Sequence, residues 1–547
     1  MISLHRLVAL FAVTACAALA PPALADGPVV NAPAGSLEGT TDGPMRVFKG
    51  IPYAVPPVGN GRWRPSMPMA PWSGVRPAKD FGPACIQPVW RGVKSVYAGD
   101  IGAQSEDCLT LNIWAPADAK KMPVFVWIYG GALVTGGSKE PLYDGAKLAS
   151  HGVIVVSLNY RLGVLGYFAH PQLSAESPQG VSGNYGLLDQ IQALNWVKQN
   201  IGAFGGDPSN VTIAGESAGG LSVMYLMASP YARGLFSKAI TESAYMISTP
   251  TLKENKYGET ASELAGKRLA TALGASGLGA LRAMDAETLS NGAVAAHFSP
   301  FGTIDGKLLP KQLVEVFDRG EQAPVPMLAG FNSGEIRSLT VLAPPVPGSA
   351  AEYESRIRDL YGDLAPEFLR LYPSSNMQES VFATSRDALY GWTAERLAKK
   401  QAALGAPSYL YLFDHGYPEE DAAGLHAFHA SELPYVFGNM DRTGQFWPKI
   451  PATAQEKALS DAMMDYWTSF AKTGAPVAAN APAWPAYGSG AAYMNFTDAP
   501  HPAANVFPGM YALHEEAVCR RRANGEMPWN WNAGLVSPKL PQGKCVP

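Results

Sequence analysis

The stretch 211–220 reads Val-Thr-Ile-Ala-Gly-Glu-Ser-Ala-Gly-Gly. A run of β-branched and apolar residues leads into a Gly-x-Ser-x-Gly motif, and this order is typical of a buried strand that turns abruptly into a helix. Gly215 and Gly219 carry no Cβ atom, so the strand and the helix can approach closely around a strained backbone at Ser217. A serine hydroxyl is a weak nucleophile. The motif therefore predicts a histidine base and a carboxylate elsewhere in the chain.

Strands and helices are expected to alternate on both sides of this turn. Short apolar runs bounded by Gly, Pro and Asn are typical of central parallel strands, and they occur at 108–114, 124–128, 153–158, 238–241, 325–329 and 408–413. Apolar residues recur at helical spacing at 184–203, 260–273, 385–403 and 454–471. The alternation predicts an α/β fold with a large, mostly parallel sheet covered by helices on both faces.

The composition fits one large globular domain. The chain has 547 residues, of which 47% are hydrophobic and 16% charged, values that suit a protein with a sizeable core. A net charge of −4 shows no basic surplus, so no nucleic-acid partner is expected. We find no internal repeat or linker, and we expect residues 26–547 to form a single domain.

The N-terminus has the features of an export signal. His5 and Arg6 precede an apolar run at 7–20, and Ala-Leu-Ala at 23–25 has the form of a signal-peptidase site. We predict a signal peptide over residues 1–25 and a secreted or periplasmic product. The alternative is a lipoprotein anchored through Cys16, because Val-Thr-Ala-Cys also resembles a lipoprotein cleavage box. No later stretch reaches about 18 uninterrupted apolar residues, so no integral membrane segment is predicted after signal removal.

Four cysteines remain after the predicted cleavage: Cys85, Cys108, Cys519 and Cys545. An even count in an exported chain suggests disulfides. Sequential pairing, Cys85 with Cys108 and Cys519 with Cys545, is the local choice among the three possible connectivities. None of them forms a Cys-x-x-Cys pair, which argues against a zinc site.

A second small-residue segment precedes the serine motif. Residues 127–132 read Trp-Ile-Tyr-Gly-Gly-Ala and follow the predicted strand 124–128. Backbone N–H groups in such a loop can stabilise the oxyanion of a tetrahedral intermediate. This segment therefore predicts an oxyanion hole for a nucleophilic Ser217; the alternative is a plain glycine turn.

With these motifs in hand, the chain resembles the type-B carboxylesterases, the cholinesterase and carboxylesterase group of the α/β-hydrolase superfamily. The matching stretches are 48–59, 105–112, 129–132, 159–163, 183–190, 204–208, 215–220 and 429–438. They run through most of the mature chain in the order that the family shows.

The resemblance implies that Glu335 is the acid and His429 the base. Glu335 follows the predicted strand 325–329, but Gly334 and Ile336 flank it in place of the commoner Asp-Glu-Gly form. The alternative for Glu335 is a solvated loop carboxylate. His426 is the rival histidine, and the family pattern selects His429. The resulting chain order, serine then acid then histidine, is the one expected on this fold.

The resemblance also places the oxyanion donors and some pocket residues. The donors would be the N–H groups of Gly131, Ala132 and Ala218, with the Ala132 methyl group at a place often held by glycine. We expect the substrate pocket to include four further residues, by resemblance or placement: Trp90, Tyr97, Leu133 and Phe331. Aromatic walls of this kind favour aryl or medium-chain esters.

Other matching residues are expected to be structural. Arg62 with Glu106 and Arg161 with Asp189 resemble buried ion pairs of the family. The first disulfide of the family closes a loop over the pocket mouth, here 86–107. Its limited reach favours a rigid rim over a mobile lid. The choline-binding tryptophan of cholinesterases has no match in this loop, which argues against a specialised choline esterase.

The predicted function is that of a serine carboxylesterase that cleaves small-molecule carboxylic esters through an acyl-enzyme on Ser217, without a metal or organic cofactor. A lipase, or a specialised esterase for a natural polyester, toxin or phenolic ester, is the alternative. A non-catalytic cholinesterase-like binding module is a remote alternative, because such modules usually lose the serine that this chain keeps.

Overall fold

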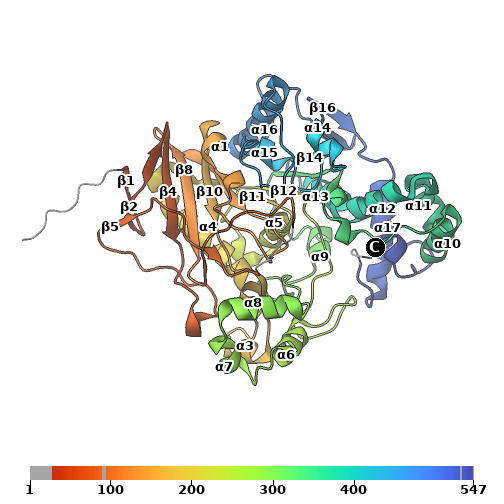
Figure 1. Ribbon diagram of the computed structural model, residues 1–547, viewed down its shortest axis with the longest axis horizontal. Helices are drawn as coiled ribbons and strands as arrows, with labels where there is room; N and C mark the ends of the chain where they lie inside the picture. Colours follow the sequence, from red (N-terminus) through yellow and green to blue (C-terminus); the bar gives the residue numbers. More distant parts are fainter. Residues whose placement is uncertain (1–26, 89–93, 489, 530–531, 546–547) are drawn as a thin grey trace, which may run out of the picture.

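The computed structural model describes residues 27–88, 94–488, 490–529 and 532–545 (Figure 1). The predicted signal peptide at 1–25, including Cys16, and the predicted pocket residue Trp90 lie outside the described residues.

One mixed sheet of 11 strands forms the centre of the molecule. Its strands are, in spatial order, β16 (Pro500–Ala504), β15 (Ala492–Phe496), β14 (Ser408–Phe413), β13 (Met327–Asn332), β12 (Lys238–Glu242), β11 (Gly206–Glu216), β9 (Met122–Ile128), β10 (Ile154–Leu158), β8 (Thr110–Pro116), β4 (Met45–Pro52) and β3 (Thr40–Asp42). The run from β15 to β10 is parallel throughout. The strands at both edges pair antiparallel.

Two smaller sheets lie outside this one. One contains β1 (Val29–Ala32), β2 (Gly35–Glu38) and β5 (Val75–Pro77), and the other pairs β6 (Ala84–Cys85) with β7 (Gln104–Ser105). The second pair sits at the two ends of the loop that the Cys85–Cys108 disulfide closes.

The predicted α/β fold is confirmed, and every predicted strand range contains a strand. Residues 124–128 of β9 and all of β10 are buried, which requires cover on both faces of the sheet. Strand β14 has the predicted bounds. Strand β13 starts at Met327, because Pro326 has no N–H to donate, and it runs three residues beyond the predicted end, through Phe331 to Asn332.

Helices surround the sheet and occupy the predicted ranges (Figure 1). They are α1 (Ala146–Ser150), α2 (Gly163–Tyr167), α3 (Pro171–Glu176), α4 (Tyr185–Asn200), α5 (Ala218–Ala228), α6 (Ser262–Ala272), α7 (Leu278–Ala283), α8 (Ala286–Ala295), α9 (Leu313–Asp318), α10 (Ala350–Tyr361), α11 (Ala365–Leu371), α12 (Met377–Arg386), α13 (Trp392–Ala403), α14 (Pro418–Ala422), α15 (Leu433–Val436), α16 (Ala454–Thr473) and α17 (Met510–Asn524). Helix α5, which follows Ser217, is buried along its whole length.

The predicted helix 385–403 is interrupted. A π-helical turn, η9 (Asp387–Gly391), joins α12 to α13. Such a turn inserts one extra residue into the helix, and the spacing of apolar residues does not reveal this insertion. Such π turns are frequent at functional sites. The Asp387 carboxylate accepts hydrogen bonds from Arg386 Nε (2.6 Å) and Tyr372 Oη (2.9 Å), and these contacts hold the turn.

Both disulfides follow sequential order. Cys85 is bonded to Cys108, and Cys519 in α17 is bonded to Cys545. In the part of the chain that the structure describes, no helix is long and apolar enough to cross a membrane.

Candidate active site

Ser217 occupies the apex of a sharp turn between β11 and α5. Its backbone has φ 55° and ψ −121°, a conformation that L residues seldom adopt. The strain is held by two hydrogen bonds of 2.9 Å, from Ser217 N to the Glu242 carbonyl and from Leu221 N to the Ser217 carbonyl. A Cβ atom on Gly219 would lie 2.0 Å from the Ile128 carbonyl oxygen, so this position has no room for a side chain.

Glu335 begins the short 3₁₀ helix η5 (Glu335–Arg337), directly after β13. Its side chain is fully buried. One carboxylate oxygen accepts a hydrogen bond from Asn332 N (2.8 Å), and the other lies 2.5 Å from Nδ1 of His429. Glu335 is therefore a buried partner of the histidine and not a solvated loop residue.

The unusual residue before the acid has a packing reason. Gly334 N donates to the Ala427 carbonyl (3.0 Å), which joins the acid segment to the histidine loop. A Cβ atom on Gly334 would lie 1.9 Å from the His426 carbonyl oxygen. The departure from the Asp-Glu-Gly form thus reflects a close backbone approach beside Glu335.

His429 lies in the loop between α14 and α15 and is 5% exposed. Asn332 Nδ2 donates to the Phe428 carbonyl (2.8 Å), which ties this loop to the end of β13. Ala427 and Ala430, on either side of the histidine, both have left-handed backbones with φ of 47° and 69°. The rival His426 is 41% exposed and pairs with Asp421 (2.7 Å), away from Glu335.

Glu216 is a neighbour of the histidine that the sequence reasoning missed. Its Oε1 lies 2.9 Å from Nε2 of His429, opposite the ring nitrogen that faces Glu335. Among the described residues, no hydrogen bond joins Ser217 Oγ to this Nε2, a bond that in free enzymes often tightens only with substrate. Because Glu216 directly precedes Ser217, the imidazole is nevertheless located at the turn. In the sequence, the only indication that Glu216 contacts the histidine was its position inside the serine motif.

Four buried glutamates form one cluster: Glu216 and Glu335 contact His429, and Glu242 and Glu432 interact electrostatically with Glu216. Burial raises the pKa of Glu242 to about 8, although Trp467 Nε1 donates to it (3.0 Å). Burial and the neighbouring Glu242 also raise the pKa of Glu432 well above its usual value. Burial therefore favours the neutral form of both carboxyl groups.

The pKa of His429 is raised well above its usual value. Burial alone lowers this pKa, but the carboxylates of Glu216 and Glu335 favour the imidazolium more strongly. A general base acts in its neutral form, so this environment would set the acidic limit of any reaction that uses His429 as a base.

Replacement of Glu216 by glutamine is expected to move the acidic limb of the kcat/KM profile to lower pH. The variant keeps the shape of the side chain but removes one negative charge that stabilises the imidazolium, so the pKa of His429 falls. Initial rates with a soluble chromogenic ester between pH 4 and 9 measure the shift. The control is Glu367→Gln, a half-buried glutamate that pairs with Arg370. An acidic limb at the same pH in wild type and Glu216→Gln would contradict the effect of Glu216 on the pKa of His429.

The predicted oxyanion donors lie around the same turn. Gly131 and Ala132 have φ of 97° and 57°, and both residues are exposed. Their N–H groups form no hydrogen bond with other described residues. Ala218 is the first residue of α5, and the N–H groups in the first turn of a helix have no partner within that helix. The left-handed conformation of Ala132 explains why glycine suits this position.

Of the predicted pocket residues that the structure describes, Tyr97 contacts the histidine loop, and Leu133 and Phe331 lie in the core. Tyr97 Oη donates to the His429 carbonyl (2.8 Å). Leu133 and Phe331 are fully buried, with Phe331 packed 6.1 Å from the Phe507 ring. Tyr390, which the sequence reasoning missed, presents its ring 5.2 Å from the imidazole from within the π turn η9.

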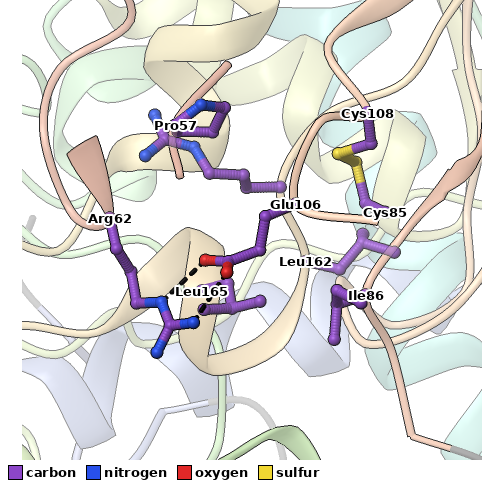
Figure 2. A pocket seen from close by; sticks show the side chains of 9 residues that line it. Pro57, Arg62, Cys85, Ile86, Glu106, Cys108, Leu162 and Leu165 are labelled. Carbon is purple, nitrogen blue, oxygen red and sulfur yellow. Dashed lines mark hydrogen bonds and ion pairs between the residues drawn. A yellow bond between two sulfur atoms is a disulfide. The ribbon is translucent and has the colours of Figure 1, made fainter. Parts of the chain in front are cut away.

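The predicted ion pairs form and are structural. Arg62 Nη2 lies 2.6 Å from Glu106, and Arg161 Nη2 lies 2.7 Å from Asp189. Figure 2 shows the first pair facing the Cys85–Cys108 disulfide across a small cavity. Arg62 Nε donates to the other Glu106 oxygen, and Nη1 donates to two backbone carbonyls, so all three guanidinium nitrogens have partners within the protein.

A mostly parallel mixed sheet with a serine at a strand–helix turn, and an acid and a histidine after later strands, defines an α/β-hydrolase. Residues 26–510 match the model of the Carboxylesterase family, and the chain belongs to this family. It is accordingly a carboxylic ester hydrolase.

Several relatives are similar over most of their length. The para-nitrobenzyl esterase of Bacillus subtilis (strain 168) is 39% identical over 474 residues, which cover 84% of this chain and 92% of that protein. Fumonisin B1 esterase of Sphingopyxis macrogoltabida is 37% identical over 480 residues, covering 84% and 85%. A solved PNB esterase structure superposes with a TM-score of 0.76 at 35% identity, covering 89% of this chain and 99% of that chain.

Proposed function

We propose that Ser217, His429 and Glu335 form a catalytic triad that hydrolyses esters through an acyl-enzyme. The observation that carries this proposal is the position of the His429 imidazole. One ring nitrogen lies 2.5 Å from the buried Glu335 carboxylate, and the other faces the turn that presents Ser217. A base fixed by a third group beside a strained serine is the arrangement that acyl transfer requires.

In acylation, Ser217 Oγ attacks the ester carbonyl carbon and gives its proton to His429 Nε2. Glu335 accepts the Nδ1–H hydrogen bond, which fixes the tautomer and stabilises the imidazolium. The N–H groups of Gly131, Ala132 and Ala218 receive the oxyanion. Each such donor contributes about 10²- to 10³-fold to kcat.

The tetrahedral intermediate then collapses. The bond from the carbonyl carbon to the alcohol oxygen breaks, and the His429 imidazolium protonates the departing alcohol. In deacylation a water molecule attacks the Ser217 ester, gives its proton to His429, and releases the carboxylic acid as the serine regains a proton. No step consumes a co-reactant other than water.

The substrate is proposed to be a small soluble carboxylic ester. The similarity to a para-nitrobenzyl esterase supports this, and the similarity to a fumonisin B1 esterase keeps a specialised toxin esterase as the alternative. A series of chromogenic esters of increasing acyl length separates these from a lipase, whose rate rises above the solubility limit of its substrate. The intact Ser217, His429 and Glu335 constellation argues against a non-catalytic binding module.

We propose that the mature protein begins at Asp26 and is secreted or periplasmic, with a lipoprotein anchored through Cys16 as the alternative. The two disulfides support an oxidising compartment. The mass of the N-terminal peptide of the mature protein distinguishes a free Asp26 from an acylated Cys16.

The triad is tested by treating the protein with an organophosphonate and locating the adduct by peptide mass. We expect a single adduct on Ser217 that forms in parallel with the loss of esterase activity. A label on another residue, or full activity without any label, excludes Ser217 as the nucleophile.

A further inference from the structure

One hydroxyl group connects the segments that carry the acid and the base. Tyr97 Oη lies 2.8 Å from the His429 carbonyl oxygen and 2.6 Å from Ser338 Oγ. A carbonyl has no proton to give, so Tyr97 donates to His429, and the Ser338 hydroxyl must donate to Tyr97. Ser338 follows the η5 turn that begins with Glu335. This chain of two hydrogen bonds therefore spans from the acid segment to the histidine itself.

The Tyr97 side chain is held in place from several sides. Its ring lies 6.4 Å from Trp447 and 6.5 Å from Phe428, both in edge or tilted contact. The residues on either side of Tyr97 pack against Gly444, where a Cβ atom would lie 3.0 Å from the Val96 carbonyl oxygen and 3.1 Å from that of Ala98. Tyr97 is 38% exposed, so these contacts and its two hydrogen bonds, rather than full burial, fix the position of its hydroxyl.

The histidine backbone has particular need of such a bond. Ala427 and Ala430 both adopt left-handed conformations, which are costly for residues with a side chain, and only surrounding contacts can maintain them. The neighbouring bonds from Asn332 and Gly334 reach Phe428 and Ala427, and the Tyr97 hydroxyl bonds the carbonyl of His429 itself.

In this structure Nε2 of the imidazole faces Glu216, whereas the proposed mechanism requires it to face the Ser217 hydroxyl. Glu216 Oε1 lies 2.9 Å away, and the next residue is the proposed nucleophile. A small rotation of the histidine therefore decides whether Nε2 faces Glu216 or the Ser217 hydroxyl. Misplacement of a catalytic group by about 1 Å can lower a rate by roughly 10²-fold.

We propose that Tyr97 is a positioning residue for His429, and that through it the Cys85–Cys108 loop is part of the support of the catalytic base. The proposal rests on the triad proposed above. Tyr97 acts through the histidine backbone, so its hydroxyl governs kcat and not the affinity for the ester. The disulfide joins the two ends of the loop that carries Tyr97, which restricts the conformations of that loop.

The test is Tyr97→Phe, which removes the hydroxyl and keeps the ring. We expect kcat to fall about 10-fold while KM changes by less than about two-fold. Ser338→Ala removes the donor to Tyr97 and is expected to lower kcat by a smaller factor. In the Tyr97→Phe background it should have no further effect, because the two hydroxyls act in one chain.

The matched control is Tyr231→Phe. Tyr231 is 44% exposed and donates to Gln179 Oε1 (3.1 Å) outside the site, so its loss should leave kcat and KM unchanged. Thermal unfolding of every variant reports whether the fold is intact. If Tyr97→Phe does not fold, Ser338→Ala alone decides, and an unchanged kcat in that variant overturns the proposal.

Two results overturn the role of Tyr97 while sparing the triad. The first is a folded Tyr97→Phe variant with wild-type kcat, and the second is a variant in which only KM rises, as expected for a plain substrate contact. Organophosphonate labelling of the same samples separates the two proposals. Label on Ser217 with unchanged kcat refutes Tyr97 alone, whereas label elsewhere refutes the triad.

Discussion

Replacement of Ser217 by alanine is expected to lower kcat by roughly 10⁴- to 10⁶-fold, because it removes the atom that attacks the ester. The residual rate comes from the oxyanion donors and from substrate binding. Alanine fits the turn, since Ser217 contributes its backbone to the hydrogen bonds with Glu242 and Leu221. The fold and the thermal unfolding temperature should therefore change little.

Steady-state hydrolysis of a chromogenic ester measures this effect, with organophosphonate labelling as a second readout. Ser209 at the other end of β11 provides the control. It is exposed and its hydroxyl donates to Asp207, far from His429 in the sequence and outside the serine turn, so Ser209→Ala should retain full activity and labelling. Retention of more than about one hundredth of the wild-type kcat in Ser217→Ala would place the nucleophile elsewhere.

Replacement of Glu335 by glutamine should lower kcat by roughly 10³- to 10⁴-fold with a preserved fold. Glutamine can still accept the hydrogen bond from Asn332 N through its amide oxygen. It has no charge to stabilise the imidazolium, and its NH₂ group favours the wrong tautomer of His429. Full kinetics on the purified variant, with circular dichroism as the check on folding, measure the loss.

Glu432→Gln is the matched control for this variant. Glu432 belongs to the same buried cluster, but burial and the neighbouring Glu242 raise its pKa, so a neutral amide resembles the form that this environment favours. Its hydrogen bond from Asn332 Nδ2 (2.5 Å) can persist with the amide oxygen. We expect a kcat loss below about 10-fold. Equal losses in the two variants would mean that Glu335 is not the specific acid.

The sequence predicts correctly those parts of the site that depend on a local pattern of residues. The apolar run before Ser217 and the glycines around it predict a strand–turn–helix, and the structure has β11 and α5 in these places. The segments of Glu335 and His429 were found through their family motifs. Their contact follows from topology, because both residues come after parallel strands at the same edge of the sheet.

Local sequence patterns could not predict the contacts between residues that are distant in the sequence. The bond between Tyr97 and His429 spans 332 positions, and no periodicity encodes it. The placement of Tyr390 depends on a π turn, which shifts the helical phase inside an otherwise regular amphipathic stretch. Glu216 lies within the serine motif, but that motif predicts a backbone turn. It does not predict that the Glu216 side chain contacts His429, because this contact forms only in the folded chain.

The glycine beside Ser217 restricts how this enzyme can diversify. A side chain on Gly219 would collide with the backbone oxygen of Ile128 in β9, and no choice of rotamer relieves a collision that involves the Cβ atom itself. Any single substitution of Gly219 therefore disrupts the turn, and this position must remain glycine as the protein evolves. Changes in ester preference have to accumulate in side chains around the site, such as Tyr390, whose ring lies 5.2 Å from the imidazole and outside the serine turn.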